Sequence, residues 1–551
     1  MHDTGKPTVP SPSVIAPLAL ALLVSVASWA ILFAVIPPED QNFPLGDDWA
    51  FCLGAMEFAR GHGIHYFQWA SMPQLGQWLW ACPFVWGFDG SLVALRLSTI
   101  LLSWLGLAAF YDLLRLAGRL PPARAAFAVA VLALNPMFFL LQGTFMTDVP
   151  SLSFALIALT FYYRAWSSAR TSWLCAAVFV AIVAGITRQN TAAVPLVAGI
   201  LLCRFPKLRF RPGCWAAVIV PFVVAVATHQ WLEQHGDMSH LRRLLPPIYM
   251  LLLPFLIVHL CGLSVLPLIA LDPWPRSWKC FGIALVSMLA GAGYWWAASE
   301  LHRPDQYLAY GGWFPYCTGM MGPWGAFSQG LVVGDRDLLL GEEMRKFLSF
   351  LGCVGGAWLI DRLLDRLLVS DFWSDPILIL TALQIPLLIL LGTLYDRYVL
   401  FFLPAALYVA AASKEGDQQP HWVPAVAILL VFGAVSLGLM HDWLAWNSAR
   451  WALGRRAATE KGINPHDIEG GFEWNGWYAP VPRRRDVPPP PPNALILRFT
   501  HDYFPHVRGR YALSYSEIPG TIVVDSEPYQ EWLLPGQKRF LLIQAAPKPS
   551  P

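Results

Sequence analysis

Long apolar runs constrain this chain more than any other feature of its sequence. The first, VIAPLALALLVSVASWAILFAVI at 14–36, contains no charged residue, and about 20 apolar residues are enough to cross the hydrocarbon core of a bilayer. Charged residues make up 13% of the chain, whereas soluble domains carry roughly 25%. The sequence therefore predicts an α-helical polytopic membrane protein.

Similar runs recur and predict about thirteen membrane-spanning helices. The first run is longer than the apolar region of a signal peptide, and Lys6 is its one preceding basic residue, so we read it as an uncleaved first span. Two of the later runs are short and could form a tilted or sunken hairpin. The predicted spans are 14–36, 91–116, 125–141, 149–165, 172–187, 190–204, 214–230, 247–271, 279–298, 347–368, 376–394, 397–412 and 422–440.

Basic residues concentrate in alternate short loops, and such loops face the cytoplasm. The basic loops contain Arg115, Arg119, Arg124, Arg164, Arg170, Arg204, Lys207, Arg209, Arg211, Arg276, Lys279, Arg362, Arg366 and Lys414. This orientation places the N-terminus inside and everything after residue 441 outside. We therefore expect a transmembrane catalytic domain at 1–441, with outer loops at 37–90 and 299–346, and an extracytoplasmic domain at 442–551.

The outer segments differ in character. Segment 37–90 is rich in Trp and Phe, which predicts helices lying in the interface with their rings at headgroup level. Its Cys52 and Cys82 either pair or remain small apolar side chains. In the tail, the proline run at 488–492 indicates a stiff spacer. The runs NALILRF, GTIVVDS and KRFLLIQ predict strands of a small α/β or β domain.

Two acidic sites lie at the outer ends of predicted spans. In FPLGDDWAF (43–51), Asp47 and Asp48 stand side by side; adjacent helical residues point about 100° apart, so we expect one of them to face any given cavity. In TFMTDVPSL (144–152), Asp148 lies in a loop of a few residues. Helix capping is the alternative at both sites, by Asp47 or Asp48 in the first and by Thr147 or Asp148 in the second.

Two arginines lie on the same side of the membrane. Arg188 in GITRQNTAA interrupts an apolar stretch, and Arg397 in LYDRYVLFFLPAAL is flanked by Tyr395, Asp396 and Tyr398. An arginine near a bilayer is costly, and its natural partner is an anion such as a phosphate. The alternatives are that Arg188 reaches out to water and that Asp396 and Arg397 form a surface pair of little energetic value.

These residue types suit group transfer from a lipid-borne phosphate. Arginines stabilise a leaving phosphate, and a carboxylate accepts the proton of an attacking hydroxyl. The chain has no P-loop and no dinucleotide fingerprint, and His62 and His65 lack a clear third ligand. We expect no cofactor, with a divalent metal left open.

The acidic pair in the first outer loop, the F-x-T-D-x-P segment and the Arg-Tyr entering a late helix resemble the family-39-type membrane glycosyltransferases. These belong to the GT-C superfamily, with protein O-mannosyltransferases and lipid A aminoarabinose transferases as relatives. The resemblance covers roughly residues 14–412. It implies a GT-C fold with an outer-face cavity, and inverting transfer from a polyprenyl-phosphate sugar without a catalytic metal.

Residue by residue, the resemblance implies that Asp47 is the base, that Asp48 stands where Glu or another polar residue is usual, and that Asp148 is the second-loop acid. It places the Arg-Tyr at Arg397 and Tyr398, and Arg188 as a carrier-phosphate ligand. The full predicted site has the catalytic acids Asp47, Asp48 and Asp148 and the donor-phosphate ligands Arg188, Arg397, Tyr395 and Tyr398.

The sequence thus predicts a hexosyl- or pentosyltransferase that uses a polyprenyl-phosphate sugar and a lipid, glycan or protein acceptor, surrounded by membrane lipids and without a nucleic-acid partner. The expected location is a bacterial inner membrane, with the site facing the periplasm or exterior. One alternative is a secondary transporter or lipid-linked glycan flippase, although transporters keep such charges near the midplane, often within repeats. The other is a non-catalytic membrane assembly protein.

Overall fold

A computed structural model describes most of the chain. The described residues are 12–67, 70–235, 247–272, 282, 286, 320–326, 332–369, 372–391, 395–412, 420–478, 494–497, 501 and 503–546. The proline run at 488–492 lies outside them, as does nearly all of the predicted span at 279–298. Of the predicted outer loop at 299–346, only 320–326 and 332–346 are described.

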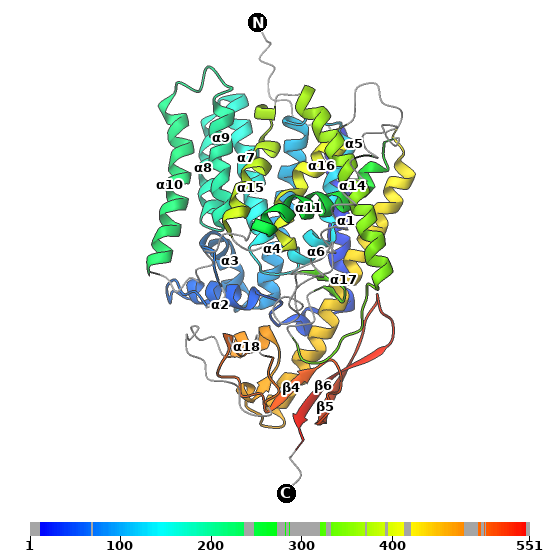
Figure 1. Ribbon diagram of the computed structural model, residues 1–551. Helices are drawn as coiled ribbons and strands as arrows, with labels where there is room; N and C mark the ends of the chain where they lie inside the picture. Colours follow the sequence, from blue (N-terminus) through cyan, green and yellow to red (C-terminus); the bar gives the residue numbers. More distant parts are fainter. Residues whose placement is uncertain are drawn as a thin grey trace.

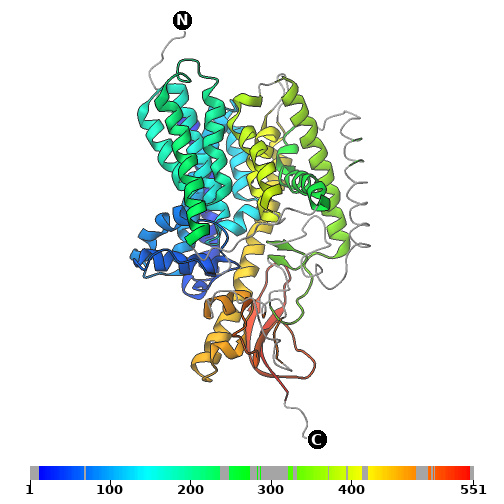
Figure 2. The same ribbon diagram turned by 60° about the vertical axis from the view of Figure 1, so that its left-hand side comes forward.

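Helices dominate these residues, and a small sheet lies near the C-terminus, which confirms the predicted class. The longer helices run side by side as a bundle, and the sheet lies beyond one end of it (Figures 1 and 2). The helices are α1 (Pro12–Val35), α2 (Asp48–Ala59), α3 (Leu75–Gly87), α4 (Leu92–Leu116), α5 (Pro122–Ala133), α6 (Pro136–Gln142), α7 (Asp148–Ser168), α8 (Thr171–Gly185), α9 (Ala193–Leu202), α10 (Pro212–His235), α11 (Pro247–Ser264), α12 (Leu266–Ile269), α14 (Glu342–Val369), α15 (Pro376–Leu391), α16 (Leu403–Ala411), α17 (Trp422–Thr459) and α18 (Phe472–Tyr478).

Short 3₁₀ helices and strands complete the described chain. They are η1 (Pro38–Gln41), η2 (Gln189–Ala192), η4 (Phe372–Ser374), η5 (Asp396–Phe401), η6 (Pro465–Asp467), β1 (Met321–Gly322), β2 (Gly325–Ala326), β3 (Ile468–Glu469), β4 (Tyr511–Ser514), β5 (Thr521–Gln530) and β6 (Gln537–Ala545).

Five described helices are long and apolar enough to cross a membrane: Ala16–Val35, Leu92–Leu116, Pro212–Gln234, Glu343–Leu367 and Trp422–Thr459. A bent pair, α5 and α6, counts as a sixth if it forms one span. The chain is an integral, multi-pass membrane protein, and the total of about thirteen spans stays a prediction.

The predicted span at 125–141 is broken into α5 and α6, which are bent by 63°. Asn135 lies at the break, and its side-chain Oδ1 accepts hydrogen bonds from the amides of Met137 (3.1 Å) and Phe138 (3.3 Å). Pro136 follows directly; it disfavours helical geometry at Asn135 and suits the first turn of a new helix. The Asn-Pro pair therefore ends one helix and begins the next.

The first outer loop forms α2 and α3, which lie across the end of the bundle (Figure 1). Trp86 is 68% exposed, as expected for a ring at the headgroup level, but Trp49 and Trp78 are buried inside the protein. Some aromatic residues of this loop therefore pack within the fold instead of facing lipid. Cys52 and Cys82 are free thiols.

Helix α17 is 38 residues long and passes well beyond the predicted span at 422–440. Its extension packs against the four-stranded sheet, whose strand order is β3-β4-β6-β5. Strands β5 and β6 confirm two predicted strands, whereas residues 494–497 of NALILRF form none. The predicted boundary at 441/442 falls inside α17, so the tail is joined to the bundle by a continuous helix.

Candidate active site

Asp47 and Arg397 meet across 350 residues of sequence. Nη1 of Arg397 donates to Oδ2 of Asp47 at 2.8 Å. Asp47 ends the loop before α2, and Arg397 lies in η5, which replaces the start of the predicted helix at 397–412. Both side chains are largely buried, so the pair is shielded from water and its charges interact strongly.

Asp148 and Arg188 form a second pair. Nη1 of Arg188 donates to Oδ1 of Asp148 at 2.5 Å and to Oγ1 of Thr147 at 3.2 Å. Arg188 lies at the break between α8 and η2 and is 5% exposed. The interpretation that Arg188 reaches out to water is therefore wrong, because its guanidinium turns inward to a carboxylate.

Tyr398 connects the two pairs. Its ring centroid lies 5.4 Å from Cζ of Arg188 and 6.0 Å from Cζ of Arg397. The ring centroid of Tyr395 lies 4.9 Å from Cζ of Arg397, and the ring of Tyr395 packs edge to face against that of Tyr398. Burial raises the pKa of Tyr395 to about 12, so its hydroxyl keeps its proton at neutral pH. Six of the seven predicted site residues thus form one continuous cluster.

The two capping interpretations are wrong. Asp47 and Thr147 occupy the N-cap positions of α2 and α7, yet neither side chain makes a capping hydrogen bond. Asp48 and Asp148 are the first residues of these helices. Each carboxylate is engaged by another segment instead, as expected when partners in the fold compete with local caps.

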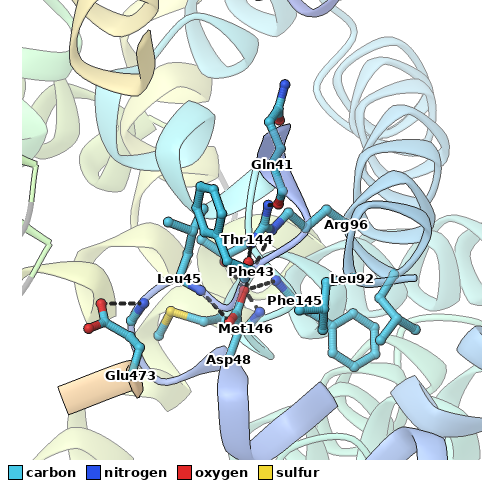
Figure 3. Close-up of polar contacts among 12 residues, drawn as sticks. Gln41, Phe43, Leu45, Asp48, Leu92, Arg96, Thr144, Phe145, Met146 and Glu473 are labelled. Atoms are coloured by element: carbon cyan, nitrogen blue, oxygen red, sulfur yellow. Dashed lines mark hydrogen bonds and ion pairs between the residues drawn. The ribbon is translucent and has the colours of Figure 1, made fainter. Parts of the chain in front are cut away.

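Asp48, the seventh predicted residue, makes its contacts with Leu45, Phe145 and Arg96 (Figure 3), none of which belongs to this cluster. Its Oδ1 accepts from the amide of Leu45 at 2.6 Å, and its Oδ2 accepts from the amide of Phe145 at 3.3 Å. Nε of Arg96 lies 3.8 Å from Oδ2. Because Phe145 belongs to the loop that carries Asp148, Asp48 ties the two acidic loops together.

Burial raises the pKa of Asp48 from 3.8 to about 7, although Arg96 and the two backbone amides offset part of the shift. In the folded protein Asp48 therefore binds a proton that the unfolded chain has lost between pH 4 and 7. The stability that this proton confers is complete below the unfolded pKa and is lost as the pH rises through the folded pKa.

We expect the free energy of unfolding of the wild type, minus that of Asp48→Asn, to fall between about pH 4 and pH 7 and to be flat above. Asn keeps a carbonyl acceptor but does not titrate, so it isolates the contribution of Asp48. Thermal unfolding of both purified proteins across this pH range measures the difference. A difference that is constant or rises over this range would contradict the assignment.

Asp396 does not form the surface pair considered from the sequence. It is fully buried, and its carboxylate accepts hydrogen bonds from the amides of Met320 (3.1 Å), Met321 (2.9 Å) and Arg397 (2.7 Å). Burial raises its pKa to about 6, against these hydrogen bonds. Asp396 thus connects the outer segment at β1 to Arg397.

Sequence reasoning missed three further charged residues near Asp47. Arg96 donates to the carbonyls of Gln41 and Phe43, and Glu473 and Arg450 approach the same loop from the tail. Arg96 lies one turn into a predicted span, an unusual position for a charge, and this could have identified it. Nothing in the sequence relates the tail to the first loop.

No group of three or more His, Cys, Asp or Glu side chains that could hold a metal is present in the described parts of the chain. The expectation of a metal-independent site stays a prediction.

Part of the chain is similar in sequence to a known protein family. The family model described as dolichyl-phosphate-mannose-protein mannosyltransferase matches residues 72–231. These residues include Asp148 and Arg188 but neither Asp47 nor Arg397. No curated protein matches the chain by sequence.

Several solved structures are similar at low identity. ArnT from Cupriavidus metallidurans in the apo state is 14% identical, with 98% of this chain and 99% of that chain covered and a TM-score of 0.41. The archaeal oligosaccharyltransferase AglB from Archaeoglobus fulgidus is 12% identical, with 90% and 64% covered and a TM-score of 0.42. The arabinosyltransferase EmbB from Mycobacterium smegmatis is 16% identical, with 77% and 44% covered and a TM-score of 0.34. The family-model match bears out, over residues 72–231, the resemblance to protein O-mannosyltransferases that the sequence motifs indicated.

Proposed function

We propose that the chain transfers a sugar from a polyprenyl phosphate to an acceptor hydroxyl at the outer face of a bacterial inner membrane. The observation that carries this proposal is the convergence of two carboxylate–guanidinium pairs, Asp47 with Arg397 and Asp148 with Arg188, around Tyr398. The confirmed family resemblance supports the reaction class. The acceptor is a lipid, a glycan or a protein, and the sugar is a hexose or pentose.

Asp47 is the proposed general base. The acceptor hydroxyl attacks the anomeric carbon, a new carbon–oxygen bond forms, and the bond from that carbon to the phosphate oxygen breaks with inversion. The bonding electrons leave with the polyprenyl phosphate, and the hydroxyl proton passes to the Asp47 carboxylate and then to water. Asp148 holds Arg188 in place through the 2.5 Å contact.

Arg397 is the proposed ligand of the donor phosphate. Its Nη1 is engaged by Asp47, while its Nε is buried and has no hydrogen-bond partner within the described chain. A buried unpaired N–H costs about 1–3 kcal/mol, and a phosphate oxygen would satisfy it. The guanidinium can therefore bind the leaving group while it stays beside the base.

The function is tested with purified protein, a panel of undecaprenyl-phosphate pentoses and hexoses, and membranes from cells that lack the gene as the source of acceptor. We expect label from one donor to enter the membrane fraction, with release of undecaprenyl phosphate. Neither transfer nor hydrolysis with any donor, including donor lipids extracted from the same cells, would contradict the proposal.

Tyr398 is expected to contribute to phosphate binding through its ring, not through its hydroxyl. A desolvated cation–π contact is worth up to about 2 kcal/mol, and the ring orients both arginines. Tyr398→Leu should weaken binding of undecaprenyl phosphate about tenfold, whereas Tyr398→Phe should bind like the wild type. Native mass spectrometry of the three proteins measures the affinities, and equal weakening in both variants would contradict the role of the ring.

A further inference from the structure

The loop that carries Asp47 is held from the C-terminal tail. The amide of Gly46 donates to Oε1 of Glu473 at 3.0 Å, across 427 residues of sequence. Gly46 has φ +59°, in the left-handed region that favours glycine. It is the residue directly before Asp47. Figure 3 shows Glu473 on α18 reaching the loop beside Leu45.

Glu473 is in turn fixed by a second charge. Nη1 and Nη2 of Arg450 both donate to Oε2 of Glu473 at 3.0 Å. Arg450 belongs to the extension of α17, is fully buried, and also donates to Oδ1 of Asn447 at 2.7 Å and to the carbonyl of Gly470 at 3.2 Å. One oxygen of Glu473 is thus fixed by α17, which leaves the other free to accept from Gly46.

A second contact reaches the same loop two residues after Asp47. Trp49 packs against Phe472 and Phe504 at ring distances of 6.1 and 5.8 Å. A Cβ added to Gly476 would lie 2.4 Å from the Trp49 ring, so α18 and α2 are in direct contact. Tail residues therefore hold the chain on both sides of Asp47.

Stability alone explains this arrangement poorly. Burying two charges costs desolvation energy that their attraction only partly offsets, and apolar residues of similar size often serve folding equally well. What an apolar pair cannot supply is an acceptor for the Gly46 amide. The function of the pair is therefore best sought at the residue that this amide positions.

We propose that Glu473, fixed by Arg450, is a positioning residue for Asp47, so that the C-terminal tail sets the geometry of the transfer step. This inference rests on the proposed role of Asp47 as the base. Displacing a catalytic group by about 1 Å can reduce a rate roughly 100-fold. The effect should fall on kcat and leave donor binding intact, since Glu473 contacts neither arginine of the cluster.

The test compares Glu473→Gln, Glu473→Leu and the double variant Arg450→Met with Glu473→Leu. Gln keeps an acceptor for Gly46, so kcat should stay within about tenfold of the wild type. Leu removes the acceptor and leaves Arg450 buried without a carboxylate partner, so both Tm and kcat should fall. The double variant removes both charges, so its Tm should recover while its kcat stays about 100-fold low.

Activity is measured with donor lipids and membranes from cells lacking the gene, and binding with undecaprenyl phosphate. Recovery of kcat together with Tm in the double variant would overturn the proposal, as would an unchanged kcat in Glu473→Leu. Glu531→Leu is the matched control: its carboxylate is as buried and pairs with Arg336 at 2.8 Å, but it does not contact the loop of Asp47. It should lower Tm without changing kcat per folded protein.

Asp47→Asn in the same assay distinguishes the positioning role of Glu473 from the proposed role of Asp47 as the base. If Asp47→Asn transfers sugar at the wild-type rate, the proposed base is wrong whatever Glu473 does. If Asp47→Asn is inactive and the double variant keeps the wild-type kcat, only the positioning role is wrong.

Discussion

Asp47→Asn should reduce sugar transfer by about 10²- to 10⁴-fold, the contribution expected of a general base. Asn has the shape of Asp, and its carbonyl can still accept from Nη1 of Arg397, which now lies 2.8 Å from Oδ2. It cannot take the proton of the acceptor hydroxyl. The loss should therefore appear in kcat, with undecaprenyl phosphate bound as tightly as by the wild type.

A control is Asp112→Asn, which alters a more exposed carboxylate that pairs with Arg164 at 2.5 Å away from the cluster. It should transfer sugar like the wild type. The same variants distinguish the alternatives, because in a transporter Asp47→Asn would reduce flux across the membrane, and in an assembly protein it would change little. Full transfer by Asp47→Asn would exclude the proposed base.

Arg397→Met should weaken binding of undecaprenyl phosphate by at least about tenfold and reduce transfer accordingly. The hydrogen bond proposed from Nε to the phosphate involves charged groups and is worth about 1.5–3 kcal/mol, which corresponds to about 10- to 100-fold in affinity. The variant also leaves Asp47 buried without its partner, which costs about 3–5 kcal/mol of stability. Lys is no substitute, because it lacks the planar fork that contacts two oxygens.

The loss of stability requires its own control. Arg124→Met breaks a comparably buried ion pair, in which Nη2 of Arg124 donates to Asp272 at 2.8 Å, and Arg124 is remote from the predicted site. Asp272 keeps its contact with Arg362 at 3.4 Å, so this variant should lower Tm by less than Arg397→Met and keep the affinity for undecaprenyl phosphate. Equal affinities of Arg397→Met and the wild type would contradict the assignment of the phosphate ligand.

Much of the cluster could be predicted from the sequence because each of its charges stands at the end of an apolar run. Loop charges then set the side of the membrane, and this brings Asp47, Asp148, Arg188 and Arg397 to one face. The partner of each arginine could not be predicted, because the sequence allows either arginine to pair with either Asp47 or Asp148. The pairing depends on how the loops before α2 and α7 pack, and only the fold determines that.

The predicted helix caps were also wrong, because partners from distant parts of the sequence bind these side chains instead. Asp48 is a good capping residue, yet its carboxylate accepts from Leu45 and from Phe145, 97 residues away. The contact of Glu473 with Gly46 has no local signature at all. By contrast, the break at Asn135–Pro136, which the predicted span at 125–141 did not include, has a local signal in the sequence, because proline constrains the residue before it wherever the pair occurs.

The central claim is that the site around Asp47 transfers a lipid-borne sugar. The most direct test compares the glycolipids and glycoproteins of cells lacking the gene after complementation with the wild type or with Asp47→Asn, expressed at equal levels. We predict that the wild type restores one glycoconjugate, and that Asp47→Asn restores none while its polyprenyl-phosphate sugar donor accumulates. Restoration of the same glycoconjugate by Asp47→Asn would contradict the claim.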